Sequence, residues 1–312
     1  MKAFLCTKYG PPEVLKPAEV EKPIPKDDEV LIRIYSAAVT ASDIYIRSGK
    51  VAWNLMVPFR IMMGITRPRK QVIGEVLSGE IEATGKSIKR FRPGDRIYGL
   101  TGFSLGAYAE YKCMKENDST NGCIAMKPGN ISFDEATMAA YGGLLAFQFM
   151  EKANIQRGQE VLIYGASSTT GTIGIQLAKS LGARVTAICS TSNIDYVKSF
   201  GADHAIDYTK QKALYPGMRY DFIFDAVGRN KTSALKKSLV RNLSSEGIMT
   251  SIDDESLKLD SKRLDLLTGL IEAGYIKPYI DKSYSFEELV EAHRFVETGH
   301  KRGGVAVRLT VI

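Results

Sequence analysis

The chain has 312 residues, of which 44% are hydrophobic and 25% charged, and its formal net charge is +7. This length suits two domains of ordinary size, and the balance of residues is typical of a soluble globular enzyme. The sequence contains no run of about 18 apolar residues, which excludes a spanning helix, and no signal-peptide pattern, so we expect a cytoplasmic protein.

The N-terminal third has the pattern of short β-strands separated by Gly, Pro and Asp, as in Arg92-Pro-Gly-Asp95. The predicted strands are 30–34, 72–77, 81–83, 96–98 and 107–111. Many short strands at this spacing favour a partly open β-barrel.

Beyond Pro128, strands and helices alternate. A capping box, with Ser132 followed three residues later by Glu135, predicts a helix start. The predicted strands are 161–164, 184–189, 204–206, 220–226 and 248–251, and the predicted helices are 171–181, 194–200, 232–240 and 262–273. This alternation implies an α/β fold with a doubly wound parallel sheet. A helix at 287–297 and a strand at 305–311 follow, and we expect that strand to return to the first domain.

A turn of small residues from Gly165 to Thr170 separates the first of these strands from its helix. Backbone N–H groups at such a turn approach a pyrophosphate closely, and the helix dipole favours the anion. Because a strand precedes the turn and a helix and a second strand follow it, the segment predicts a dinucleotide site.

The residues after the second strand bear on the choice of cofactor. An NAD site usually places Asp or Glu about 20 residues past the glycines, on the ribose 2′-hydroxyl. Here the segment reads Cys189-Ser-Thr-Ser-Asn193, and the next carboxylate is Asp195. Hydroxyl groups without a repelling charge suit a 2′-phosphate, so we predict NADPH, with Ser190 and Thr191 as contacts.

At this point the sequence resembles the medium-chain dehydrogenase/reductase superfamily, and within it the zinc-free quinone oxidoreductase and alkenal double-bond reductase branch. The resemblance covers nearly the whole chain. It is carried by the cofactor turn and by the motifs at 38–49 (AVTASDIYIRSG), 92–99 (RPGDRIYG), 106–111 (GAYAEY), 200–208 (FGADHAIDY), 225–228 (DAVG) and 299–303 (GHKRG). It implies a GroES-like catalytic domain in residues 1–127 and 275–312 around a Rossmann domain in residues 128–274.

The resemblance also implies roles for individual residues. Tyr45 would line the substrate side of the nicotinamide, with Thr40 and Asp43 in the same motif, and we expect Asp43 to accept backbone N–H groups rather than to act as a base. The expected cofactor contacts are Ser167, Thr169, Thr170 and Gly171 at the pyrophosphate, Ser190 and Thr191 at the 2′-phosphate, Tyr208 at the adenine, Val227 at the nicotinamide ribose, and Ser251, His300 and Arg302.

Two departures from the family pattern bear on these roles. The family turn usually reads Ala-Ser-Gly-Gly-Val-Gly, whereas this chain has Ser168, Thr169 and Thr170 before Gly171. Their side chains would narrow the pyrophosphate site or add hydroxyl donors. Thr40 replaces the Asn that is usual in the branch.

The residues also argue against a catalytic metal. Catalytic zinc needs three N, S or O ligands and an open fourth position. Zinc-bearing relatives have a Cys ligand where this chain has Thr40 and a His ligand where it has Glu75. We therefore predict no metal. Plain alcohols are then poor substrates, because nothing stabilises the alkoxide, whereas quinones and enones are already electrophilic.

The function that these observations favour is NADPH-dependent, zinc-free reduction of quinones or α,β-unsaturated carbonyls. Two alternatives stay open: an NADP-dependent alcohol or carbonyl dehydrogenase, and a non-catalytic nucleotide-sensing or RNA-binding member of the fold. The second alternative rests on the altered turn and on the segment 60–96, which has nine Lys and Arg against four acids. We expect a small electrophilic substrate and no membrane partner, do not favour nucleic acid, and leave a homodimer open.

Overall fold

The computed structural model describes residues 1–51, 53, 56–214, 217–228 and 233–309. They form two compact units. Unit 1 contains Met1–Tyr141, Leu259–Thr268 and the described part of Ile280–Ile312, and unit 2 contains Gly142–Lys258 and Gly269–Tyr279.

Unit 1 is built on a largely antiparallel sheet in which the strand order is β13-β14-β3-β4-β5-β7, with β6 paired to β3. Its strands are β1 (Lys2–Cys6), β2 (Leu15–Glu19), β3 (Glu29–Ala38), β4 (Val76–Thr84), β5 (Arg96–Leu100), β6 (Tyr111–Lys115), β7 (Cys123–Met126), β13 (Ile280–Ser285) and β14 (Gly304–Arg308). Its helices include α1 (Ala41–Ser48), α2 (Met56–Met63), α3 (Phe133–Met138) and α9 (Leu289–Glu297).

Several predicted strand boundaries in this unit were wrong. Of the predicted strand 72–77 only residues 76 and 77 are in a strand, β4, which continues through the predicted strand 81–83 and in which Gly79 lets the backbone of β3 approach. A Cβ on Gly79 would lie 2.1 Å from the Arg33 carbonyl oxygen. The predicted strand 107–111 is replaced by β6, which begins at Tyr111. The amides of Ala107 and Tyr108 donate instead to the carbonyl oxygens of Gly74 and Ile73.

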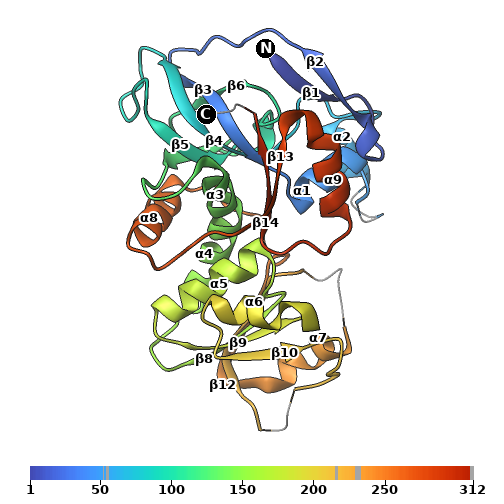
Figure 1. Cartoon of the computed structure of the whole chain (residues 1–312), viewed down its shortest axis with the longest axis vertical. Coiled ribbons are helices and arrows are strands. Elements are labelled where there is room, and N and C mark those ends of the chain that lie inside the picture. The colour runs from blue at the N-terminus through green and yellow to red at the C-terminus, as the bar shows by residue number, and fades with distance from the viewer. Residues whose placement is uncertain (52, 54–55, 215–216, 229–232, 310–312) are drawn as a thin grey trace. The chain divides into compact units, whose positions relative to one another are not determined.

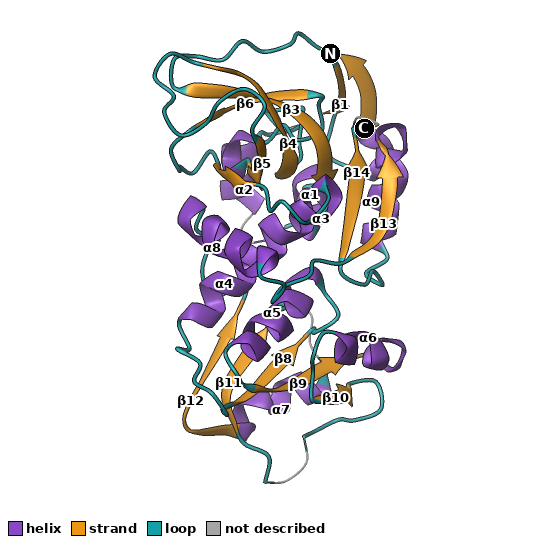
Figure 2. Cartoon of the chain, turned by 60° about the vertical axis from the view of Figure 1, so that its left-hand side comes forward, coloured by secondary structure: helices purple, strands orange, loops and turns teal. Residues whose placement is uncertain are grey.

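The C-terminal tail completes unit 1, as predicted. β14 pairs antiparallel with β3, with Ala306 opposite Ala38. Val305 and Val307 enter the same hydrophobic core as Val30 and Ile32 of β3. Figure 2 shows β13 and β14 running alongside α9.

Unit 2 has a parallel sheet in the order β10-β9-β8-β11-β12, which confirms the predicted α/β fold. Its strands are β8 (Glu160–Tyr164), β9 (Arg184–Cys189), β10 (His204–Asp207), β11 (Tyr220–Asp225) and β12 (Leu243–Ser251). Its helices include α4 (Leu144–Glu151), α5 (Thr169–Ser180), α6 (Ile194–Ser199) and α7 (Ala234–Ser238). Figure 1 labels these elements except β11, which is labelled in Figure 2. The first residue of the predicted helix 232–240 and the end of the predicted strand 305–311 lie outside the described residues.

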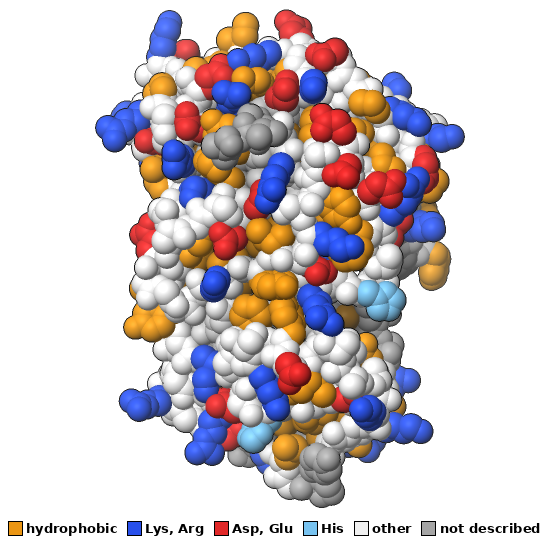
Figure 3. Space-filling model, viewed as in Figure 1, with side chains coloured by type: hydrophobic (Ala, Val, Ile, Leu, Met, Phe, Trp, Pro, Cys, Tyr) orange, Lys and Arg blue, Asp and Glu red, His pale blue; other side chains and the backbone are white. Residues whose placement is uncertain are grey.

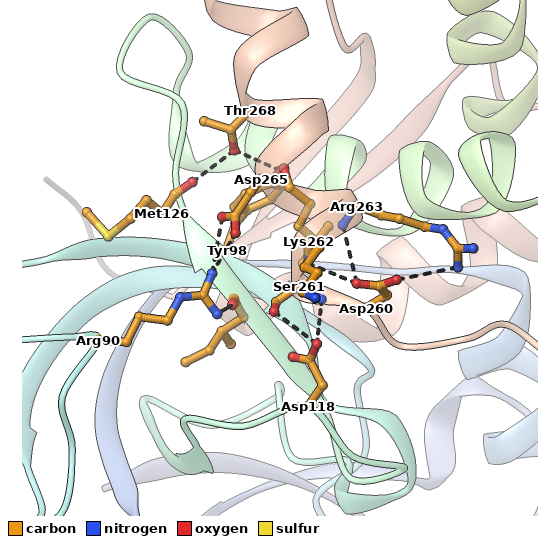
Figure 4. Close-up of polar contacts among 12 residues, drawn as sticks. Arg90, Tyr98, Asp118, Met126, Asp260, Ser261, Lys262, Arg263, Asp265 and Thr268 are labelled. Atoms are coloured by element: carbon orange, nitrogen blue, oxygen red, sulfur yellow. Dashed lines mark hydrogen bonds and ion pairs between the residues drawn. The ribbon is translucent and has the colours of Figure 1, made fainter. Parts of the chain in front are cut away.

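Residues 275–279 belong to unit 2, and residues 128–141 and 259–268 belong to the compact unit 1. The first part of α8 (Ser261–Glu272) is held there by polar contacts from the β-sheet side. Figure 4 shows them: Tyr98 donates to the Leu264 carbonyl oxygen at 2.7 Å, Arg90 pairs with Asp265 at 2.9 Å, and Asp118 accepts from the Ser261 amide at 2.8 Å.

The predicted capping box at Ser132 and Glu135 is present at the start of α3.

No helix in the described ranges combines the length and the apolarity that are needed to cross a membrane.

Candidate functional site

Unit 2 gathers the carboxyl ends of its strands at one edge of the sheet. Tyr164 at the end of β8 pairs with Ile188 and Asp225, and Asp225 in turn pairs with Ser251 at the end of β12. In open parallel sheets, ligands bind outside this edge. The predicted cofactor contacts of unit 2 lie at this edge or on the segments that leave it: Ser167, Thr169, Thr170, Gly171, Ser190, Thr191, Tyr208, Val227 and Ser251.

The turn between β8 and α5 depends on two glycines. A Cβ on Gly171 would lie 2.4 Å from the Gly165 carbonyl oxygen, so the first turn of α5 sits directly on the turn that precedes it. Gly165 has φ +77°, and a Cβ there would lie 2.1 Å from Val227 Cγ2. The glycines therefore bring the helix start and Val227 against the end of β8.

The departure at Ser168 has a structural role. Ser168 is the N-cap of α5, and its hydroxyl oxygen accepts a hydrogen bond from the Gly171 amide at 3.0 Å. That amide is therefore bonded within the turn. Thr170 is buried, whereas Ser167 and Thr169 are half-buried. The latter two stay accessible at the helix N-terminus, where anions are favoured.

Ser190 and Thr191 follow β9, but their hydroxyl groups are bonded differently. Ser190 Oγ accepts from Asn193 Nδ2 at 3.2 Å and lies 3.4 Å from Ser192 Oγ, so its own proton is available to a ligand when Ser192 is the donor of that pair. Thr191 Oγ1 donates to the Asp207 carboxylate, so in this arrangement it has no proton left for a phosphate. Of the two predicted contacts, Ser190 is the better phosphate donor.

Asp207 is a carboxylate that the sequence reasoning missed at this corner. It ends β10, and parallel pairing sets it opposite Cys189. The hydrogen bond from the Thr191 hydroxyl, and then those from Thr209 through its hydroxyl at 2.6 Å and its amide at 2.9 Å, hold the pKa of Asp207 below its usual value. The next residue, Tyr208, is 42% exposed, so its ring can receive a planar ligand.

Asp225 is a second missed residue. It is 1% exposed at the end of β11 and pairs with Lys236 at 2.7 Å. Its carboxylate also accepts from the Val227 amide at 3.1 Å and from the Ser251 hydroxyl at 3.0 Å. Asp225 therefore fixes the positions of two predicted cofactor contacts. The sequence feature that could have identified Asp225 is its place in the Asp225–Gly228 motif, at the end of a buried strand.

In unit 1, the three predicted catalytic residues lie on or next to α1. Thr40 is the N-cap and Asp43 completes a capping box: Asp43 Oδ2 accepts from the Thr40 amide at 2.8 Å and from its hydroxyl at 2.7 Å. Asp43 thus accepts hydrogen bonds at a helix start, the structural role expected for it. Tyr45 is 49% exposed, so its ring is accessible to a ligand.

Asp43 and Glu75 form a pair of carboxyl groups that sequence reasoning did not foresee. Asp43 is fully buried, and its Oδ1 has no hydrogen-bond partner among the described residues, as is also true of Glu75 Oε2. Burial raises the pKa of Asp43 to about 6, and burial together with the charge of Asp43 raises the pKa of Glu75 to about 8. Two such groups cannot both ionise easily, so the pair keeps a proton near neutral pH.

Further titratable groups are buried in unit 1. His293 is fully buried with its ring 5.5 Å from the Tyr108 ring. Burial, and then the charge of Arg47, lower the pKa of His293 to about 3, so it is neutral. Arg47 is fully buried and pairs with Glu297.

His300 and Arg302 lie in unit 1, in the exposed loop between α9 and β14. The Arg302 amide donates to Asp281 Oδ2 at 2.8 Å. Their contact with a cofactor stays a prediction.

No three His, Cys, Asp or Glu side chains are grouped as a metal site in the part of the chain that the structure describes. The two positions expected to hold ligands in zinc-bearing relatives are Thr40 and Glu75. Thr40 uses its hydroxyl to donate to Asp43, so Glu75 is the one carboxylate at these two positions. On the face shown in Figure 3, Lys and Arg are interspersed with Asp and Glu rather than forming a continuous basic stripe.

Comparisons with known proteins agree with this arrangement. Residues 26–129 match the model of alcohol dehydrogenase GroES-like domains, and residues 200–307 match that of zinc-binding dehydrogenases. The chain is 31% identical over 324 residues to 2-methylene-furan-3-one reductase of Solanum lycopersicum, covering 98% of this chain and 79% of that protein. It is 29% identical to the chloroplastic NADPH-dependent alkenal/one oxidoreductase of Arabidopsis thaliana, with the same coverage. The structure of the quinone oxidoreductase from Coxiella burnetii is similar at a TM-score of 0.85 and 25% identity, covering 99% of both chains.

Proposed function

The chain belongs to the medium-chain dehydrogenase/reductase superfamily, in its zinc-independent quinone oxidoreductase and alkenal reductase branch, and we propose from this membership that it passes hydride from NADPH to quinones or α,β-unsaturated carbonyls. It is an NAD(P)H-dependent oxidoreductase. The observation that carries the proposal is the edge of unit 2, where the Gly171 turn, the Ser190 hydroxyl and the exposed Tyr208 ring occupy adjoining strand ends.

This edge fits a dinucleotide. Gly171 leaves no Cβ between α5 and the turn, so backbone amides at the helix start can face a pyrophosphate. Ser167 and Thr169 would hold that group, Val227 and Ser251 would adjoin the nicotinamide ribose, and Tyr208 would pack on the adenine. When bound, the nicotinamide supplies the hydride.

The preference for NADPH rests on Ser190. Its hydroxyl accepts from Asn193, and it can donate to a 2′-phosphate when Ser192 is the donor between the two serine hydroxyls. Asp207 brings a negative charge to the same corner, but it is bonded to Thr191 and Thr209 and lies 3.9 Å from Lys210. One of the relatives is named as NADPH-dependent, which supports the same choice.

In unit 1, Tyr45 would form a wall of the substrate site. The reduced substrate also needs a proton. A quinone oxyanion is resonance-stabilised and takes it from solvent, so the chain needs to position the reactants and exclude water more than it needs a side-chain acid. His300 and Arg302 would approach the cofactor from the same unit.

A panel of steady-state assays tests the proposal. NADPH and NADH oxidation are measured with a quinone, an enone and an aldehyde, and binding of a mixed-sequence RNA is titrated at low and high salt. We expect turnover with the quinone or the enone, faster with NADPH than with NADH. Aldehyde reduction alone would instead show a carbonyl dehydrogenase, and salt-sensitive RNA binding without turnover would show a non-catalytic protein.

A further inference from the structure

The helix α2 presents apolar side chains to solvent. None of its residues is buried. Val57 is 67% exposed, Ile61 64% and Met62 53%, and Val57 and Ile61, four residues apart, share one side of the helix. Trp53, 89% exposed, precedes the helix, and Ile65, 78% exposed, follows it. We call these five residues the apolar patch.

A different side of α2 attaches it to unit 1. The Phe59 ring lies 6.0 Å from the Tyr9 ring, and Met63 packs against the core of the unit. Arg60 lies over the same Tyr9 ring at 3.8 Å. The helix therefore has its own contacts with the fold, and the apolar patch is not the face that these contacts use. Large exposed apolar patches mark interaction sites.

The chain segment that contains the patch has basic side chains and no acidic ones. The sequence has no acidic residue between Asp43 and Glu75, and Lys50, Arg67, Arg69 and Lys70 are exposed. We call these four residues the basic rim. An occupant of the patch therefore has to offer apolar surface and negative charge together.

We propose that the apolar patch and the basic rim dock the protein on the surface of an anionic lipid bilayer. Apolar side chains of a short helix enter the boundary between headgroups and acyl chains, while Lys and Arg meet the anionic headgroups, and Trp prefers this level. This proposal goes beyond the proposed function and does not rest on it. It departs from the expectation of no membrane partner, which rested on the lack of a spanning segment.

Two other occupants fit less well. A second copy that joined through the same patch about a two-fold axis would bring two basic rims together, and like charges repel. A small apolar ligand is usually enclosed in a pocket, whereas each side chain of the patch is more than half exposed.

Trp53 is the only tryptophan of the chain, so its fluorescence reports on the patch directly. The full-length protein is mixed with phosphatidylcholine vesicles that contain or lack phosphatidylserine. With phosphatidylserine we expect a blue shift of the emission and co-sedimentation, and we expect high salt to reverse both. Sedimentation is the readout for variants whose patch is changed.

Matched variants separate the two parts of the surface. The double variant V57D/I61D should lose vesicle binding, whereas Ile24→Asp, at an apolar residue 85% exposed elsewhere, should keep it. The triple variant R67Q/R69Q/K70Q should weaken binding about a hundredfold, because each cation near an anionic surface contributes ~1 kcal/mol. Lys16→Gln is its control, and circular dichroism checks that each variant folds.

Equal binding to neutral and anionic vesicles, or no binding to either, would overturn the proposal. So would a dimer in solution that V57D/I61D dissociates, since the patch would then serve a second copy.

Discussion

The cofactor edge of unit 2 and the buried titratable groups around Asp43 in unit 1 differ in how completely their side chains are hydrogen-bonded. At the cofactor edge of unit 2, Asp225 is paired with Lys236 at 2.7 Å, and Asp207 is bonded to hydroxyl groups. In unit 1, Asp43 and His293 are fully buried, and Asp43 Oδ1 and both ring nitrogens of His293 have no hydrogen-bond partner among the described residues. The carboxylates at the edge of unit 2 are therefore held in place by bonded partners, whereas unit 1 contains groups whose pKa values are shifted by the fold.

This difference indicates where each unit is sensitive. A framework of paired groups and close backbone contacts responds to changes of shape and of added charge. Buried acids and bases whose pKa values are shifted by the fold respond to pH. Changes of shape and added charge should therefore have their main effects in unit 2, and pH should act on the buried groups of unit 1.

The largest effect is expected at the cofactor turn. Gly171→Ala places a Cβ 2.4 Å from the Gly165 carbonyl oxygen, so the turn has to move. We expect NADPH affinity to fall about a hundredfold, equivalent to ~3 kcal/mol. The control is Gly174→Ala in the same helix, where the nearest atom is 3.4 Å away, and it should bind normally. Fluorescence titration of both variants measures this, and normal binding by Gly171→Ala would refute the assigned role of the turn.

A charge at the second strand end should discriminate between the cofactors. Ser190→Asp puts a carboxylate where we place the 2′-phosphate, and like charges a few ångström apart cost ~2 kcal/mol at a partly exposed site, or about thirtyfold in NADPH affinity. NADH, which lacks that phosphate, should lose much less. Ser199→Asp adds the same charge at an exposed residue of α6 and serves as the control. Equal losses of NADPH and NADH affinity would show that the 2′-phosphate does not bind beside Ser190.

A smaller effect is expected at Tyr45 in unit 1. If its ring matters more than its hydroxyl, Tyr45→Phe lowers quinone turnover by less than about tenfold, below the 10²–10⁴-fold that a general acid contributes. Tyr45→Ala should be worse, because the site loses a wall and admits water. Steady-state kinetics of both variants at saturating NADPH decides this. A thousandfold loss in Tyr45→Phe with unchanged cofactor affinity would show that Tyr45 is a proton donor.

The smallest effect concerns the stability of unit 1 against pH. The pKa of Glu75 is raised to about 8 from 4.5, so the folded chain holds a proton that the unfolded chain has lost. That contribution to stability is complete below pH 4.5 and is lost as the pH rises through 8. His293, with its pKa lowered to about 3 from 6.5, acts in the opposite direction, but only below pH 6.5.

Between pH 6.5 and about 7.5, Glu75 should therefore make the protein less stable as the pH rises, and unfolding near pH 7 should release about one proton from this group. Glu75→Gln should flatten this slope, whereas Glu21→Gln, at an exposed carboxylate, should not. Urea unfolding at several pH values measures the slopes. Parallel slopes for the wild type and Glu75→Gln would show that the carboxyl pair is ionised in the folded protein.

The same contrast explains how much the sequence could predict. The parallel sheet and the turn at Gly171 were predictable because their signals are local: strand, small residues and helix follow one another in the chain. Asp207 beside Thr191 was missed because parallel pairing of β10 with β9, and not nearness in sequence, brings them together. In unit 1, the pair of Asp43 and Glu75 joins α1 to the residue before β4, and no periodic pattern links those segments.

Isotope transfer in a metal-free preparation tests the central claim most directly. The protein is stripped of metal, its zinc content is measured, and NADPH with deuterium at the transferable C4 position is mixed with an enone such as but-3-en-2-one. The account predicts deuterium at the β-carbon of the product at an undiminished rate. No deuterium transfer until zinc is restored, in a preparation that still binds NADPH, would contradict it.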